Sequence, residues 1–438
     1  MQRIIYKPLI DWKHTKGRKV LLVRGARQVG KTYAVRHLAA SFESHLEVNL
    51  EEERGIHAFF EGSLEPFRIC EKLSNYFNAP LEPGKNLLFL DEIQACPPAL
   101  GALRFFHEKI PELHVVAAGS LLEFALEEIP SQGVGRISSL FIYPMNFQEF
   151  LQSLGEEGPL RMMLAASPTN PLEEAFHHRL IDALKVYLLI GGMPGVINTY
   201  VKTRNLKKCQ ETLSDLLVTL RDDFSKYKKR SPVSRLEEVF ESIVFQAGGK
   251  FKYSKVNPQE KTAHVKEAMN LLIKAGLASM IRHTDARGLP LGAQVNPKRF
   301  KVMLVDIGLH QRVLGLDLST YLTSNDFEVI NKGAVAELFA GQELKTMGSE
   351  REPANLYYWH REARSSNAEI DYIIQHGEVP LPIEVKAGGT GRMQSIQRFM
   401  QERGLKKGIR TSLENFGRVN DIDIIPLYAI GHVDAFLE

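Results

Sequence analysis

Residues 19–40 read KVLLVRGARQVGKTYAVRHLAA, and this stretch decides the fold of the first part of the chain. A short β-rich run passes into a loop with a glycine at each end, and a helix-like pattern follows the loop. Residues 25–32 match G-x-x-x-x-G-K-[S/T], a loop whose backbone N–H groups bind phosphate at the start of a helix. The order strand, loop, helix therefore predicts a binding site for a nucleoside triphosphate.

The loop also carries the side chains that such a site needs. We expect Lys31 to contact the β and γ phosphates of ATP, and the Thr32 hydroxyl to be one ligand of a Mg²⁺ ion. A chance match in a turn is the alternative, and the strand and helix on either side argue against it. The residues expected to surround the nucleotide are Gly25, Ala26, Arg27, Gln28, Val29, Gly30, Lys31, Thr32 and Tyr33.

Residues 86–98, NLLFLDEIQACPP, supply the expected acidic partner of the loop. Four apolar residues predict a central parallel strand, and Asp91 and Glu92 then emerge at the carboxyl edge of the sheet, where doubly wound sheets bind ligands. We expect Asp91 to hold the Mg²⁺ ion through water and Glu92 to polarise the attacking water. Two acids after a strand are weak evidence alone, but after the phosphate loop they predict hydrolysis of the nucleotide.

Two further side chains are candidates for this site. Ser120 ends the buried-strand pattern of LHVVAAGSLLEF, residues 113–124, where it can sense the γ phosphate or cap the following helix. Arg136 follows a glycine-punctuated loop, where it can neutralise charge in the transition state, either in cis or across a subunit boundary. A surface salt bridge is the alternative for Arg136.

The stretches VRGARQVGKT, LFLDEIQ, AAGSLLEF and GRISSLFIYPMNFQEFL occur in this order. Together they resemble the prokaryotic AAA-type ATPases that carry a C-terminal domain of unknown function related to restriction endonucleases. The resemblance continues through LLIGGMPGVI, RFKVMLVDIGL and GAVAELFAGQEL, so it covers nearly the whole chain. It implies a helical lid over the ATPase, and it allows assembly into a homo-oligomer because AAA-type ATPases often form rings.

The middle of the chain is predicted to be helical and then to contain a winged helix. Residues 161–230 show helical spacing, and residues 231–325 give a helix, a short helix, a longer helix that starts near Lys261 and then a β-like run, the order of a module often used to bind DNA. Lys261, His264 and Lys266 lie on or near the longer helix, where they can contact phosphates. Protein docking or a merely solvated helix face is the alternative. Further along, Asp306 is expected to be a helix cap or loop anchor.

Residues 368–388, AEIDYIIQHGEVPLPIEVKAG, read as two strands joined by a turn. Side chains alternate along a strand, so Glu384 and Lys386 share one face. Asp371 on the partner strand and Glu384 can then hold a Mg²⁺ ion, while Lys386 helps to deprotonate a water. Glu337, on a preceding helix, is a further candidate ligand. The pattern resembles the PD-(D/E)XK nuclease core.

Two points in this C-terminal pattern stay open. Glu369 is expected to share the face of Asp371, so either acid can lead the metal site. A hairpin whose acid and lysine pair across a solvated face is the alternative to a catalytic site.

The expected fold class is α/β, with a doubly wound parallel P-loop NTPase sheet, a helical lid, a winged-helix middle domain and a C-terminal restriction-endonuclease-like α/β domain. The expected boundaries are 1–160 for the ATPase core, 161–230 for the lid, 231–325 for the winged helix and 326–438 for the nuclease-like domain. A length of 438 residues agrees with two or three domains.

Composition excludes several classes of protein. The net charge of +3, with 24% charged and 44% hydrophobic residues, is typical of a globular protein and gives no whole-molecule field for nucleic acid. The sequence has no signal-peptide pattern and no membrane-spanning run, so we expect a cytoplasmic protein. Cys70, Cys96 and Cys209 lack metal or disulfide spacing and are expected to be buried free thiols.

Three functions remain in competition. The first is a Mg²⁺-dependent ATPase coupled to a nuclease-like domain that acts on DNA. The second is a nucleotide-gated scaffold that binds nucleic acid or protein without cutting it, and the third is a signalling ATPase that regulates a protein partner.

Overall fold

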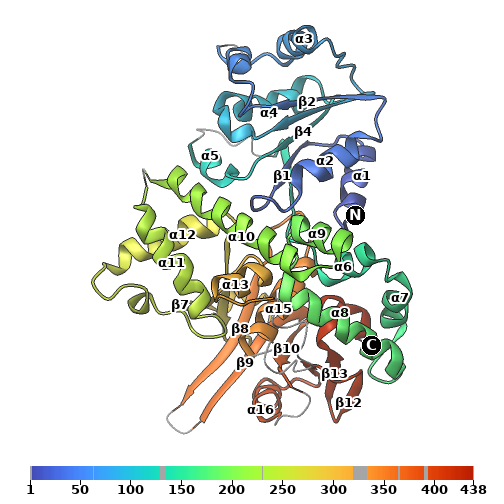
Figure 1. Ribbon diagram of the computed structural model, residues 1–438, viewed down its shortest axis with the longest axis vertical. Helices are drawn as coiled ribbons and strands as arrows, with labels where there is room; N and C mark the ends of the chain where they lie inside the picture. The colour runs from blue at the N-terminus through green and yellow to red at the C-terminus, as the bar shows by residue number, and fades with distance from the viewer. Residues whose placement is uncertain are drawn as a thin grey trace.

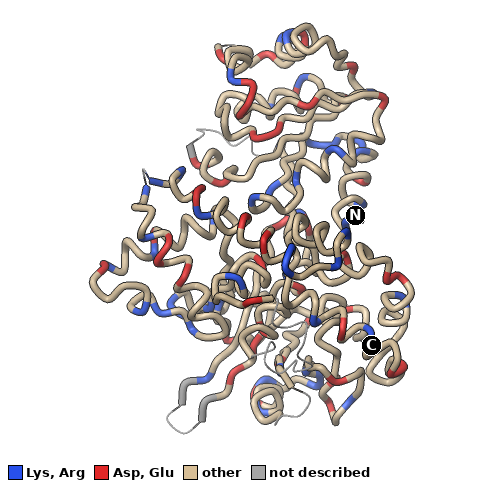
Figure 2. Tube along the Cα trace, viewed as in Figure 1, with Lys and Arg blue, Asp and Glu red and all other residues tan. Residues whose placement is uncertain are grey.

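The computed structural model describes residues 2–62, 64–128, 135–228, 230–318, 333–363, 366–388 and 393–437. Two sheets lie toward opposite ends of the molecule, and helices α9 (Pro194–Thr203) and α10 (Leu206–Asp222) lie between them (Figure 1). Basic and acidic residues are interspersed along the chain (Figure 2), as the small net charge requires. Within the described residues, no helix is long and apolar enough to cross a membrane.

The first sheet is parallel throughout, with the order β2-β3-β4-β1-β5. Alternate residues of each strand, such as Leu21 and Phe89, pack on one face with α1 (Tyr6–His14) and α2 (Lys31–Ala39). The residues between them, such as Leu22 and Leu88, pack on the other face with α3 (Pro66–Phe77) and α4 (Pro97–Lys109). The predicted doubly wound P-loop sheet is therefore confirmed. Its strands are β1 (Val20–Arg24), β2 (Ser44–Asn49), β3 (Asn86–Asp91), β4 (His114–Ala118) and β5 (Ile137–Phe141).

A helical segment follows this sheet. Its first helix begins at a capping box, in which the side chain of Asn146 accepts a hydrogen bond from Glu149 N (3.0 Å) and Glu149 Oε2 accepts one from Asn146 N (3.1 Å). This first helix is α6 (Phe147–Leu154), and α7 (Glu157–Ala165), α8 (Glu174–Ile190), α9, α10 and the short η3 (Asp223–Tyr227) follow it, whereas α5 (Leu122–Glu128) lies between β4 and β5.

The second sheet is mixed and has eight strands in the order β12-β13-β11-β10-β9-β8-β6-β7. The predicted hairpin is present as β9 and β10, with Gly377 in the turn at φ +55°. The strands are β6 (Ala278–Thr284), β7 (Val295–Leu304), β8 (Leu356–Ala363), β9 (Ser366–His376), β10 (Val379–Val385), β11 (Gly408–Ser412), β12 (Gly417–Val419) and β13 (Ile422–Pro426). The helices around it are α11 (Val233–Phe245), α12 (Thr262–Lys274), α13 (Ile307–Val313), α15 (Gly333–Met347) and α16 (Gln394–Arg403).

This sheet crosses the predicted boundary between residues 325 and 326. Strand β6 pairs with β8 in parallel, with Ile281 opposite Leu356, so the hairpin β6–β7 extends the C-terminal sheet. The predicted winged-helix domain, residues 231–325, and the predicted nuclease-like domain, residues 326–438, are therefore joined by backbone hydrogen bonds within one sheet.

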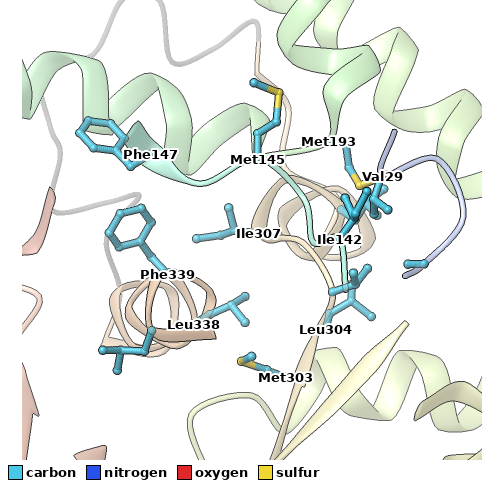
Figure 3. Close-up of a cluster of buried hydrophobic side chains, with 14 of the residues drawn as sticks. Val29, Ile142, Met145, Phe147, Met193, Met303, Leu304, Ile307, Leu338 and Phe339 are labelled. Carbon is cyan, nitrogen blue, oxygen red and sulfur yellow. The ribbon is translucent and has the colours of Figure 1, made fainter. Parts of the chain in front are cut away.

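A single apolar cluster joins the phosphate loop to the rest of the chain (Figure 3). Val29 of the loop lies in it at 0% exposure, together with Leu304 at the end of β7 and Phe339 on α15. The cluster also contains Ile142, Met145, Phe147, Met193, Met303, Ile307 and Leu338.

Asp306 anchors this region, as the sequence predicted. It is fully buried, it caps α13 by accepting a hydrogen bond from Leu309 N (3.0 Å), and it accepts another from Gly192 N (2.6 Å). Burial raises the pKa of Asp306 to about 6, and these backbone donors oppose the rise. A Cβ on Gly191, at φ +73°, would lie 2.3 Å from Asp306 Oδ1, so only glycine fits that turn.

The cysteines agree only in part with the sequence prediction. All three are free, and Cys96 and Cys209 are buried, whereas Cys70 is only partly buried. Burial raises the pKa of the Cys209 thiol to about 11, which makes it unreactive at neutral pH.

Removing Phe339 tests whether the shared cluster stabilises the chain. We expect Phe339→Ala to lower the free energy of unfolding by about 3–5 kcal/mol, because it leaves a cavity in a fully packed core. Phe245→Ala is the matched control, since Phe245 is 67% exposed, and it should change stability by less than about 0.5 kcal/mol. Urea unfolding followed by circular dichroism measures both, and equal effects would show that the cluster contributes no more than the surface.

Candidate nucleotide site

The phosphate loop has the backbone that its glycines predict. Gly25 and Gly30 have φ values of +145° and +94°, and Gln28 between them is also left-handed at +63°. A Cβ on Gly25 would lie 2.2 Å from the carbonyl oxygen of Ile142, so the loop passes too close to the end of β5 for any other residue. The sharp turn leads directly into α2.

Lys31 lies inside this loop and is 6% exposed. Its Nζ donates hydrogen bonds to the carbonyl oxygens of Gly25 (3.1 Å) and Ala26 (2.8 Å). Burial lowers the pKa of Lys31 to about 8, while the nearby Glu92 and Asp91 oppose that shift. Phosphate oxygens at the loop would supply the negative charge that this buried ammonium lacks.

Thr32 and Asp91 are in direct contact, although 59 positions separate them. Thr32 Oγ1 donates a hydrogen bond to Asp91 Oδ2 at 2.7 Å, and Glu92 N donates one to Asp91 Oδ1 at 3.0 Å. Burial raises the pKa of Asp91, and the hydrogen bond from Thr32 opposes the rise. A hydroxyl and a carboxylate side by side are oxygen donors of the kind that Mg²⁺ prefers, so the residues fit the predicted ion.

Glu92 follows β3 in a left-handed conformation, with φ +48°. Its carboxylate accepts a hydrogen bond from Gln94 Nε2, a contact that the sequence analysis missed. Gln94 lies against the end of β4, since a Cβ on Gly119 would be 1.9 Å from Gln94 Oε1. The left-handed backbone and this amide therefore fix the position of the Glu92 carboxylate.

Arg136 lies at the other edge of the sheet. Ile137 pairs with Val20 at the start of β1, whereas the phosphate loop begins after Arg24 at the end of β1. Arg136 Nε pairs with Glu108 Oε1 at 2.9 Å on the surface. The intervening strand spans about 13 Å, so the structure places Arg136 away from the phosphate loop of its own chain, and its role in cis stays an unsupported prediction. Its role across a subunit boundary stays a prediction.

Three arginine contacts around the loop were not expected from the sequence. Arg3 Nη1 donates to the carbonyl oxygen of Val29 (2.9 Å), and its Nε pairs with Glu149 (2.9 Å), so the start of the chain holds the loop. Arg27 forms an ion pair with Asp223 of η3. Tyr33, by contrast, is 56% exposed on α2, and its predicted contact with the nucleotide remains a prediction.

The C-terminal acids surround a lysine that the sequence analysis did not consider. Lys301, on β7, is 1% exposed, and its Nζ lies 2.5 Å from Glu337 Oε1 and 3.9 Å from Asp371 Oδ1. It also forms an ion pair with Glu369. Burial raises the pKa of Glu337 to about 8 and that of Asp371 to about 6, and the ammonium of Lys301 opposes both shifts.

The metal ion predicted among Glu337, Asp371 and Glu384 does not fit this arrangement. Asp371 Oδ2 accepts a hydrogen bond from Val385 N (2.8 Å), and Glu384 pairs with Lys386 at 2.9 Å. Because Glu384 is buried, this is not the solvated pair weighed as the alternative. Across the described ranges, no group of three or more His, Cys, Asp or Glu residues is placed to hold a metal. The physical reason for the misfit is that the ammonium of Lys301 already neutralises Glu337 and Asp371, as a metal ion would.

The parallel sheet, the phosphate loop and the acids after β3 define a P-loop NTPase domain. Residues 17–151 match the family model described as an AAA domain, which supports an AAA-type ATPase in this part of the chain. Residues 181–320 and 332–430 match two domains of unknown function, DUF8612 and DUF4143. The relation of the C-terminal sheet to restriction endonucleases stays a prediction.

Several solved structures are similar to the chain at low identity. The Walker-type ATPase paby2304 of Pyrococcus abyssi is 14% identical, with a TM-score of 0.47 over 72% of this chain and 96% of its own. The Aeropyrum pernix ORC1 protein in complex with DNA is 15% identical, with a TM-score of 0.28 over 73% and 92%. The Thermotoga maritima RuvB Holliday junction branch migration motor is 15% identical, with a TM-score of 0.29 over 73% and 96%. No curated protein matches the chain.

Replacing Lys301 tests whether it excludes a metal ion. In an Asp91→Asn background, which removes the carboxylate at the other site, we expect no saturable Mn²⁺ binding by calorimetry. Adding Lys301→Met removes the ammonium and should create a saturable Mn²⁺ site, because the carboxylates are left without a cation. Adding Asp371→Asn should abolish that site.

Lys298→Met is the matched control, since Lys298 is exposed on the same strand. The opposite result would be Mn²⁺ binding by the Asp91→Asn parent that is lost when Asp371→Asn is added. The acids would then bind a metal ion although Lys301 is present, and Lys301 would not exclude it.

Proposed function

We propose that the chain is a Mg²⁺-dependent ATPase whose hydrolysis of ATP controls how its other parts hold a partner, with DNA as the favoured one. The observation that carries this proposal is the contact between Thr32 and Asp91 at 2.7 Å, beside Lys31 and Glu92. Both elements of a phosphoryl-transfer site, a phosphate loop and an acid at the end of β3, thus meet at one edge of the sheet.

In this proposal Lys31 neutralises the transferred phosphoryl group, and Thr32 and Asp91 hold the magnesium ion. That ion, when bound, supplies positive charge against the phosphate oxygens. Glu92 accepts a hydrogen bond from the attacking water and orients it, while Gln94 keeps the carboxylate in place. Ser120, buried at the end of β4, is available to contact the γ phosphate.

Coupling to the helical segment would run through Arg27. Its ion pair with Asp223 joins the phosphate loop to η3, and Lys226 also lies 3.2 Å from Asp223. A triphosphate at the loop would compete with Asp223 for Arg27, whereas Lys226 would keep Asp223 paired. ATP binding would therefore loosen the contact between the loop and the helices.

The DNA part of the proposal rests on α11, α12 and the hairpin β6–β7, which follow the order of a winged helix. Lys261, His264 and Lys266 are all exposed at the start of α12, where phosphates are also favoured by the helix dipole. His264 contacts Glu260 at 3.2 Å, which reduces the positive charge there. A protein partner on the same surface is therefore the second candidate.

We do not extend the proposal to cleavage of nucleic acid. A C-terminal site with a restriction-endonuclease-like fold would need a divalent ion, and Lys301 lies where its acids converge. This arrangement favours a domain that binds without cutting.

Two substitutions test the ATPase. Lys31→Ala should abolish both ATP binding and turnover. Glu92→Gln should leave binding of a fluorescent ATP analogue intact and lower kcat by about 10²–10⁴-fold, because only the orientation of the water is lost. Glu71→Gln, an exposed change of the same type on α3, is the control. Turnover that survives both site variants would overturn the ATPase assignment.

Charge reversal tests the nucleic-acid surface. Lys261→Glu and Lys266→Glu should weaken binding to a DNA duplex and reduce its salt dependence by about one unit of slope per lost phosphate contact. Lys207→Glu, exposed on α10, should leave binding unchanged. Fluorescence anisotropy at several salt concentrations, with and without ATP, measures this.

Binding that is indifferent to salt and to these changes would point to the protein partner. Cleavage of plasmid DNA in Mg²⁺ or Mn²⁺ that is lost in Asp371→Ala would show that the C-terminal domain does cut.

A further inference from the structure

A cavity of about 320 Å³ lies where three parts of the chain meet. Its walls come from the backbone of Gly25 and Ala26, from the end of β5, from α12 and β6, and from α15 with the residues before β8. Lys31 and Thr32 are not among its lining residues, but Ser120 is, so the cavity adjoins the candidate nucleotide site without containing the side chains expected to bind phosphate and Mg²⁺. The volume is enough for a small organic molecule.

Lys345 lies in the wall of this cavity and is 9% exposed. Its Nζ donates a hydrogen bond to Ser279 Oγ at 2.8 Å and lies 4.5 Å from the centre of the Tyr143 ring. An ammonium has three donors, so these contacts leave part of its capacity unused. Burial lowers the pKa of Lys345 to about 8, and no charged group in the described parts of the chain opposes that shift.

Lys345 differs from the other two buried lysines, Lys31 and Lys301, because it has no carboxylate near its ammonium among the described residues. The ammonium of Lys301 contacts two carboxylates, and that of Lys31 lies near Asp91 and Glu92. A buried charge without a counter-ion costs several kcal/mol, roughly, because it has lost its hydration. Lys345 is thus a buried cation beside a cavity that has room for an anion.

Basic residues outnumber acidic ones in the lining of the cavity. Arg24 is paired with Glu123 at 2.9 Å, and Arg282 donates a hydrogen bond to Asn355 Oδ1 at 2.8 Å. Lys274 is the fourth basic residue in the lining, and Glu123 is its one acid among the described residues. The rest of the wall is mainly apolar and includes Ile142, Pro144 and Met280.

We propose that this cavity binds a small organic anion, with its phosphate or carboxylate group on Lys345 and its body along the apolar wall. The ligand would accept hydrogen bonds from the donors of Lys345 that Ser279 leaves unused. It would touch the backbone of the phosphate loop, the β6 hairpin and α15 together.

The test uses the full chain in a Lys31→Ala background, so that the phosphate loop does not contribute. Inorganic phosphate, succinate and AMP are the probes, with adenosine as the uncharged counterpart of AMP, and calorimetry measures binding. We expect at least one anionic probe to bind, and Lys345→Met to weaken it at least tenfold. Lys207→Met, an exposed lysine on α10, should leave binding unchanged.

Two further readouts separate binding from folding. Lys345→Met should melt at the same or a higher temperature than its parent without probe, because it removes a buried charge that lacks a counter-ion. Affinity in the parent should fall as pH rises through about 8, where Lys345 loses its proton, whereas Lys345→Arg should bind with little change.

Binding by phosphate but not succinate would assign the site to phosphate compounds, and the reverse would assign it to carboxylates. The proposal is overturned if no anionic probe binds, or if binding is the same in Lys345→Met.

Discussion

The apolar contact behind the phosphate loop is the constraint on which the rest of the molecule depends. Val29 is fully buried, and it shares one cluster with Leu304 from the second sheet and Leu338 from α15 (Figure 3). The loop therefore belongs to an apolar cluster whose other members include residues that follow it by about three hundred positions. Gly276 adds to this contact, since a Cβ there would lie 3.1 Å from Ala26. Close-packed interiors transmit strain, so a displacement of the loop is expected to displace residues that pack on both sheets.

Electrostatic contacts complement this packing at the front of the loop. Arg3 and Arg27 both precede Lys31 in the sequence, and they tie the loop to α6 and to η3. Both arginines contact carboxylates that belong to helices outside the first sheet. The loop is thus held in two ways: by apolar packing around Val29 and by the ion pairs of Arg3 and Arg27. A bound phosphate can replace the carboxylate in an ion pair, but it cannot replace the apolar packing.

The parts of the site that lie close together in sequence could be predicted from it. The phosphate loop and the acids after β3 follow from short patterns whose backbone geometry is local, and the β9–β10 hairpin follows from alternation around Gly377. Lys301 could not be found in this way, because it lies on a strand that precedes Glu337 by 36 positions. The sequence assigns its strand to the predicted winged-helix domain, residues 231–325, and not to the C-terminal domain. The parallel pairing of β6 with β8 is non-local too, and no periodicity signals it.

The two edges of the eight-stranded sheet have a consequence for assembly. One edge strand, β7, carries Pro297 and Lys298, and the other, β12, has only three residues. Proline cannot donate to a neighbouring strand, a charged side chain opposes stacking, and a very short strand offers few free backbone groups. Copies of this chain are therefore discouraged from joining edge to edge into extended sheets. Any ring or dimer that they form is therefore expected to use other surfaces of the chain than the two edges of this sheet.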